Sequence, residues 1–124
     1  MPGKTQQPKW LPKVEEHDFA AAASYLALIY PQAQCKTLIA ALRTTDIVQF
    51  KAKDIFRASQ LSLLGISNSH VEKDRAQINE GEALSPILLV RDDRDRRVIV
   101  ADGYHRLCAV YQVDEDAWIP CKIV

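Results

Sequence analysis

Apolar positions in the first part of the chain recur at helical spacing. From Asp18 to Pro31 they fall three and four residues apart, which predicts a helix capped by Asp18 and stopped by Pro31. The predicted inner face of this helix is formed by Phe19, Ala22, Tyr25, Leu26 and Ile29. A second helix is expected after Pro31, a residue suited to a first helical turn, with Leu38, Ile39, Ala41 and Leu42 turned inward.

The period of the pattern changes after residue 45. Ile47, Val48 and Phe50 indicate a short strand, residues 53–58 a helical turn, and residues 61–66 an apolar loop. A further helix is expected to be capped by Asn68 or Ser69 and to end at Gly81.

The last third of the chain reads as a hairpin, a helix and a final strand. The apolar runs 86–90 and 98–101, joined by the charged turn 91–97, predict a β-hairpin. A helix is expected to begin near His105, and residues 118–124 to form a last strand. In that strand Pro120 favours an edge or a strand end, and Trp118 is expected to face the core.

These elements predict an α+β fold in one domain, residues 15–124. Within it, residues 15–45 form a helical hairpin that precedes a core of residues 46–124. Residues 1–14 have the composition of a flexible tail, from which Trp10 is expected to dock on the body or on a partner.

Composition narrows the class of protein. The 124 residues are 48% hydrophobic and 26% charged, which suits one domain with a single core and excludes fibrous and wholly disordered classes. Sixteen basic residues balance sixteen acidic ones, so a broad basic surface for nucleic acid or membranes is not expected. No apolar run approaches the roughly 20 residues that span a bilayer, and the first thirteen residues lack a secretory apolar region. The sequence therefore predicts a cytoplasmic protein.

The three cysteines do not indicate a metal site or a disulfide framework. Cys35, Cys108 and Cys121 are odd in number, lack CxxC spacing and have apolar neighbours. They are expected to be small buried hydrophobic residues.

The most informative segment is VIVADGYHRLCAVY, in which a polar junction joins an apolar strand to an apolar helix. Free N–H groups in a first helical turn attract anions, and Gly103 is expected to let a phosphate approach the backbone. Arg106 can hold phosphate oxygens bidentately, and His105 adds a titratable donor. Asp102 is expected either to cap the helix or to hold Mg²⁺ beside the phosphates. The alternative is a capped helix start with a surface arginine.

Residues 48–124 resemble the ParB/sulfiredoxin fold. The segments that carry this resemblance occur in the family's order and at similar spacing. They are the helix VEKDRAQINEG, the segment LSPILLV, the strand VIVA and the turn ADGYHRL. The resemblance implies a small mixed sheet with helices, and a nucleotide whose phosphates bind at Gly103, Tyr104, His105 and Arg106.

The resemblance points to a stand-alone member of this superfamily. Tyr104 takes the position of the sulfiredoxin cysteine, so sulfiredoxin chemistry is not expected. The further domains of ParB partition proteins are not expected in a chain that ends at Val124. What the resemblance implies is nucleotide binding with Mg²⁺, with ATP, CTP or another nucleotide as ligand, and a nucleotide hydrolase or small-molecule phosphotransferase as the enzyme class.

In the family, the helix that starts near Asn68 approaches the nucleotide across from this turn. Glu72 and Asp74 are therefore candidate bases, and His70 is a candidate base or phosphate donor. Asp102 is a further catalytic candidate, and Lys73 and Asn68 are candidate phosphate contacts. The alternative for this segment is a solvated first turn with a salt bridge.

Two other functions stay open. The first is a non-enzymatic regulatory or scaffold module that uses the hairpin of residues 15–45 as its protein-binding surface. The second is a DNA-binding protein or nuclease that uses Lys51, Lys53 and Arg57, against which the zero net charge argues.

Overall fold

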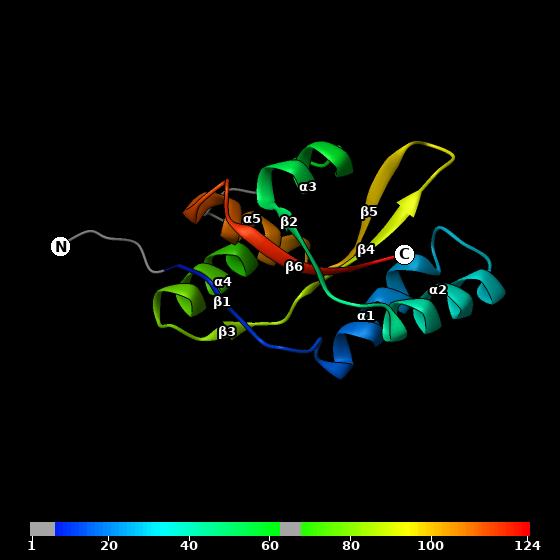
Figure 1. Cartoon of the computed structure of the whole chain (residues 1–124), viewed down its shortest axis with the longest axis horizontal. Coiled ribbons are helices and arrows are strands. Elements are labelled where there is room, and N and C mark those ends of the chain that lie inside the picture. Colours follow the sequence, from blue (N-terminus) through cyan, green and yellow to red (C-terminus); the bar gives the residue numbers. More distant parts are fainter. Residues whose placement is uncertain (1–6, 63–67) are drawn as a thin grey trace.

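A four-stranded sheet forms the centre of the computed structural model, which describes residues 7–62 and 68–124 (Figure 1). Its strand order is β2 (Val48–Lys51), β6 (Trp118–Ile123), β4 (Ile87–Asp92) and β5 (Arg97–Asp102). β6 pairs antiparallel with β2 and parallel with β4, whereas β4 and β5 form the expected antiparallel hairpin. The sheet is mixed and combined with helices, so the predicted α+β class is confirmed.

Helices cover both faces of this sheet (Figure 1). On one face, α3 (Ala52–Ser59), α4 (Ser69–Asn79) and α5 (Tyr104–Val113) enclose a core that contains Leu89 of β4. On the other face, α1 (Glu16–Leu26) and α2 (Gln32–Thr44) enclose a core that contains Leu88 and Val90. Because β4 is buried on both faces, its apolar run does not alternate with polar residues. The predicted hairpin of residues 15–45 is therefore one layer of the domain.

The first helix begins earlier and ends earlier than the sequence predicts. Glu15 is its N-cap, and the N–H of Glu15 donates to Ser85 Oγ over 3.0 Å. That contact fixes the chain three residues before Asp18, so the prediction that Asp18 caps the helix is wrong. Asp18 instead lies in the first turn and is buried.

The inner face of α1 is also narrower than predicted. Phe19, Ala22 and Leu26 are buried as expected. Tyr25 and Ile29 are 43% and 40% exposed, so their assignment to the inner face is wrong. The helix ends at Leu26 and Ile29 lies in the turn that follows, while Pro31 serves as the N-cap of α2.

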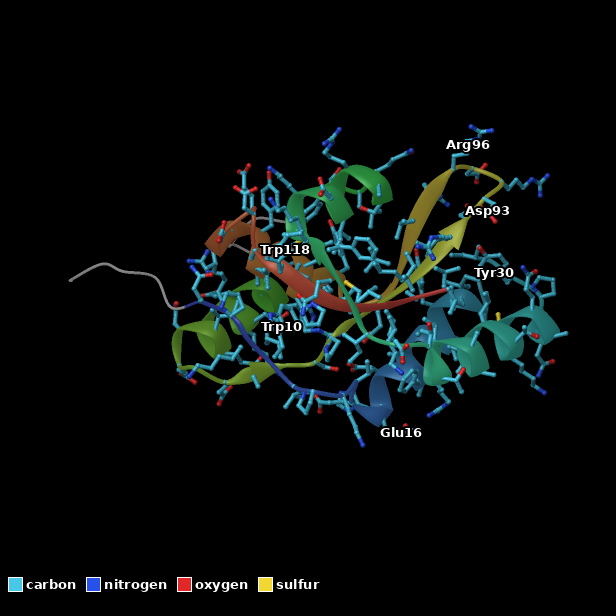
Figure 2. All side chains as sticks on the ribbon, viewed as in Figure 1. Trp10, Glu16, Tyr30, Asp93, Arg96 and Trp118 are labelled. Atoms are coloured by element: carbon cyan, nitrogen blue, oxygen red, sulfur yellow. The ribbon has the colours of Figure 1, made fainter. Side chains whose placement is uncertain are left out.

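The last strand differs from the prediction at two residues. β6 lies inside the sheet and Pro120 is its third residue, so the expectation that Pro120 marks an edge or a strand end is wrong. Pro120 pairs with Gln49 of β2 and precedes Cys121, the first residue of β6 that pairs with β4. Trp118 is 59% exposed rather than turned to the core, with Lys51 Nζ 5.3 Å from its ring centroid (Figure 2).

The amino-terminal segment contains a strand that the sequence did not predict, whereas the expected docking of Trp10 on the body is confirmed. β1 (Lys9–Trp10) pairs in parallel with β3 (Ala83–Leu84), and the N–H of Leu11 donates to the carbonyl of Leu84. Trp10 packs against the core that α4 and α5 enclose (Figure 2). This contact gives the segment an apolar anchor.

Several local predictions are confirmed. Asn68 caps α4, and its side-chain oxygen accepts from the N–H groups of His70 and Val71. Gly81 follows α4 with a φ of +76°. The three cysteines are buried. Most of the predicted apolar loop, at residues 63–66, lies outside the described residues.

Across residues 7–62 and 68–124, no helix has both the length and the apolar character to cross a membrane.

Candidate phosphate site at the start of α5

A small polar hollow lies where the first turns of α4 and α5 meet. Its volume is about 170 Å³. The side chains and backbone around it belong to His70, Lys73, Asp74, Asp102, Gly103, Tyr104, His105 and Arg106. These are the residues that the sequence singled out, apart from Asn68 and Glu72. The structure thus brings two segments more than 25 residues apart in sequence into one site.

The backbone at this place is set by Gly103, the N-cap of α5. Its φ of +104° is a left-handed conformation that residues with a Cβ rarely adopt. Among the described residues no side chain caps α5, so the predicted cap by Asp102 is wrong. The first-turn N–H groups of a helix have no partner within the helix, so this end carries a partial positive charge.

Arg106 does not point freely into the hollow. Its Nη2 donates to Asp18 Oδ2 at 3.3 Å, to Asp102 Oδ2 at 3.2 Å and to the carbonyl of Pro86 at 3.3 Å. The side chain of Arg106 is 17% exposed, and that of Asp18 is 4% exposed. The alternative of a surface arginine is therefore wrong, because this guanidinium joins three parts of the fold.

This arrangement also removes the open approach that was expected at Gly103. A Cβ placed on Gly103 would lie 2.9 Å from Arg106 Nη2 and 2.9 Å from Ile87 Cγ1. The space beside the glycine is thus filled by the arginine of the same turn and by a buried side chain of β4. In this conformation a phosphate cannot lie directly on Gly103.

Two carboxylates share the single guanidinium. Burial raises the pKa of Asp102, and Asp18 raises it further, while Arg106 opposes the rise. Asp18, Asp102 and Arg106 together carry one excess negative charge when all are ionised. The Arg106 end of the hollow is therefore not cationic, and an anion is favoured nearer the other side chains.

On the side of the hollow that faces α4, the rings of His70 and His105 have centroids 4.8 Å apart and planes inclined by 36°. Burial and the neighbouring His70 lower the pKa of His105, whereas Asp74 opposes this. Burial raises the pKa of Asp74, although Arg106, His105, Lys73 and His70 all act to lower it. Two imidazoles, one ammonium and a half-buried carboxyl group thus converge on this side of the hollow, a set that supplies both anion contacts and acid–base groups.

The remaining predicted residues have other contacts. The hydroxyl of Tyr104 donates to the carbonyl of Ser62, and burial with the neighbouring Cys108 raises the pKa of Tyr104 to about 12. The side-chain oxygen of Asn68 is used as the cap of α4. Glu72 is exposed on the same helical turn but lies outside the hollow.

Comparison with known proteins gave no match to a family model, to a curated protein or to a solved structure. The resemblance to the ParB/sulfiredoxin fold is thus carried by the sequence pieces alone and stays a prediction.

Sequence reasoning missed the role of Asp18. Its partner Arg106 lies 88 residues later, so no local pattern connects the two. One signal was present, because Asp18 lies one helical turn before Ala22 on the buried face of α1. A charged residue on such a face needs a partner of opposite charge.

The described residues do not form a metal site by themselves. Within residues 7–62 and 68–124, no three His, Cys, Asp or Glu side chains are placed to hold one metal ion. Asp102, the predicted Mg²⁺ ligand, is already bound to Arg106. A Mg²⁺ ion at this hollow would need most of its oxygen ligands from water or from a bound ligand.

The two alternative functions, nucleic-acid binding and a protein-binding module, would use different surfaces. Of the predicted nucleic-acid contacts, Lys53 pairs with Asp116 at 2.7 Å, Arg57 lies 3.9 Å from Asp54, and Lys51 lies over Trp118. These acidic neighbours reduce the positive charge available to a phosphate backbone.

The helical hairpin carries an apolar groove. It runs between α1 and α2 and is lined in part by Ala23, Ala27, Tyr30 and Ile39. Nothing in the described structure shows what covers this groove.

The imidazole pair gives a testable pH dependence. Because the pKa of His105 is lower in the folded protein than its usual 6.5, the unfolded chain takes up its proton first as the pH falls. The free energy of unfolding should therefore decrease as the pH falls through 6.5 toward the lower folded value. Urea unfolding at pH 7.5 and 5.5 measures this decrease, and His105→Gln should show a smaller one. An equal decrease in both proteins would contradict the assignment.

Proposed function

We propose that this protein binds the phosphate group of a nucleotide in the hollow between α4 and α5. The observation that carries the proposal is the convergence of His70, Lys73 and His105 on an uncapped helix start, the first turn of α5. Such a helix end presents N–H groups and a partial positive charge to an anion. The family resemblance supplies the expectation that the anion belongs to a nucleotide.

The size and lining of the hollow favour a phosphate group over a whole nucleotide. Its volume of about 170 Å³ is below the ~300 to 1,000 Å³ of pockets that enclose drug-sized ligands. Most of its lining residues are polar or charged, which offers little surface for a base. The nucleoside would therefore extend out of the hollow, and the base would contribute less to affinity than the phosphates.

The charges favour a phosphate between the first turns of α4 and α5. His70 and Lys73 come from the first turns of α4, and His105 from the first turn of α5. The Asp18–Asp102–Arg106 cluster carries an excess negative charge when both carboxyl groups are ionised, which disfavours an anion directly beside it. Bound phosphate would favour the protonated imidazole of His105, so affinity should increase as the pH falls below 6.5.

Isothermal titration calorimetry tests the binding. ATP, CTP, GTP and ADP are titrated with and without Mg²⁺, and inorganic pyrophosphate is titrated as the probe without a base. We expect pyrophosphate and the nucleotides to bind with dissociation constants within about tenfold of one another, since the phosphates carry the contacts. The proposal fails if none of them binds more tightly than about 1 mM, or 4.1 kcal/mol.

Replacing Lys73 with alanine should weaken this binding. A charge-assisted contact contributes about 1.5 to 3 kcal/mol, and Lys73 is exposed, so we expect the lower end and a roughly tenfold rise in Kd. Lys36→Ala, an exposed lysine on α2 away from the hollow, is the matched control and should leave Kd unchanged. Equal effects of the two variants would place the anion elsewhere.

Hydrolysis or phosphoryl transfer is a second candidate, which the half-buried Asp74 favours. Its raised pKa and its position beside His70 and His105 suit a group that accepts a proton from an attacking water or alcohol. The titration mixtures, assayed for released phosphate after incubation with and without Mg²⁺, test this candidate directly. Binding without release of phosphate would leave a nucleotide-binding protein that is not a hydrolase.

A further inference from the structure

Arg106 is held by contacts that leave part of its hydrogen-bonding capacity unused. All three of the contacts described above involve one nitrogen, Nη2, at 3.2 to 3.3 Å. Charge-assisted N–H···O bonds are usually about 2.7 to 2.9 Å long and often bidentate. Nε of Arg106 is buried and has no acceptor among the described residues. The contacts of the guanidinium are therefore made through a single nitrogen, Nη2.

Asp18 is the partner that comes from outside the segment of family resemblance. It lies in α1, which packs on the sheet face opposite to α5 through Phe19, Ala22 and Leu26. Its carboxylate contacts the guanidinium of Arg106 in α5, the helix that follows β5. The helical hairpin thus contacts the candidate site through one buried charge.

Asp18 keeps a second partner when Arg106 leaves. His17 Nε2 lies 3.2 Å from Asp18 Oδ1, the oxygen that does not contact Arg106. His17 is exposed. The loss of Arg106 would consequently leave the carboxylate of Asp18 beside this imidazole rather than without any polar neighbour, which lowers the cost of releasing the arginine.

We propose that Asp18 is an internal competitor of the bound phosphate: it holds Arg106 across Gly103 in the free protein, and a phosphate in the hollow draws Arg106 away from it. This inference rests on the proposed phosphate site. Release of the guanidinium uncovers the backbone of Gly103 and turns an unused pair of N–H donors toward the anion. The affinity for phosphate then depends on how much more favourably Arg106 interacts with the anion than with Asp18.

The test compares Asp18→Asn with the wild type in titrations with inorganic pyrophosphate. The amide keeps the shape of the side chain but removes the charge that competes with the anion. We expect Kd to decrease by at least ~5-fold, the lower end of typical coupling between sites. Glu16→Gln is the matched control, because it removes one negative charge from the same helical turn while its own partner is Arg43. It should leave Kd within ~2-fold of the wild type.

The outcomes separate the two proposals. If neither the wild type nor Asp18→Asn binds pyrophosphate, the phosphate site itself is absent. If both bind with equal Kd, or if Glu16→Gln tightens binding as much as Asp18→Asn, the phosphate site stands and the competition by Asp18 is refuted.

A measurement on the wild type decides the matter if Asp18→Asn does not fold. The side-chain Nε–H resonance of Arg106 is followed by NMR during the pyrophosphate titration. A shift that saturates together with binding supports release of the guanidinium. A resonance that does not move while pyrophosphate binds overturns the inference.

Discussion

Replacing Arg106 with leucine is expected to lower the free energy of unfolding by about 3 to 5 kcal/mol, the usual cost of removing one partner from a buried ion pair. The variant leaves Asp18 and Asp102 facing one another without the guanidinium between them, and Asp18 is 3% exposed. It also removes the donor to the carbonyl of Pro86. Urea or guanidinium unfolding monitored by circular dichroism measures the loss.

Two further proteins control this result. Arg57→Leu removes an exposed arginine whose acidic neighbour is 3.9 Å away, and it should cost less than about 0.5 kcal/mol. The double variant Asp18→Asn with Arg106→Leu should regain part of the loss, because it removes one of the two unpaired charges. A loss below about 1 kcal/mol in Arg106→Leu would show that the ion-pair cluster does not stabilise the fold.

Replacing Gly103 with alanine is expected to cost about 2 to 6 kcal/mol, since left-handed backbone strain and overpacking each contribute roughly 1 to 3 kcal/mol. The added Cβ would lie 2.9 Å from Ile87 Cγ1, and Ile87 is fully buried in β4, so it cannot move aside. The same Cβ would push Arg106 away from Asp18 and Asp102. Thermal and urea unfolding measure the change.

Gly81→Ala is the matched control for this substitution. Gly81 has a similarly positive φ of +76°, but a Cβ there would lie 3.5 Å from Lys9 Nζ, the mobile end of a long side chain. It should therefore show the backbone strain alone, about 1 to 2 kcal/mol. If the two variants lose the same stability, crowding around Gly103 is not significant.

The elements that the sequence predicted well are those determined by neighbouring residues. The cap by Asn68 depends on N–H groups two and three residues later, and the hairpin of β4 and β5 depends on one charged turn. The apolar run of β4 indicated a strand because it was too short for a helix. Local signals of this kind do not need knowledge of the fold.

The features that the sequence predicted wrongly depend on strand order and on contacts between distant residues. Pro120 indicates an edge strand in isolation, but β6 lies between β2 and β4, an order that no local pattern contains. Trp118 is apolar yet exposed, because it is the first residue of β6 and its ring lies beside the ammonium of Lys51 rather than in a core. Glu15 begins α1 because Ser85 accepts its N–H, a contact across 70 residues.

In the candidate site, too, local signals were predicted and distant contacts were not. The sequence identified His70, Lys73, Asp74 and the turn from Asp102 to Arg106, since the resemblance to the ParB/sulfiredoxin fold implied that the two helix starts meet. It did not predict the direction of the Arg106 side chain. That direction is determined by Asp18, whose helix packs on the opposite face of the sheet. The sequence pattern thus predicted which residues surround the hollow. Tertiary packing determined whether the side chain of Arg106 is free to contact an anion.

The central claim is that a phosphate binds at the first turn of α5. The most direct measurement follows backbone ¹H–¹⁵N resonances of the whole chain while inorganic pyrophosphate is added. The claim predicts that the amides of Tyr104, His105 and Arg106 shift most, with the first turn of α4 next, and that all saturate at one Kd. Shifts concentrated instead around Lys51, Lys53 and Arg57, or no saturable shift at millimolar pyrophosphate, would contradict it.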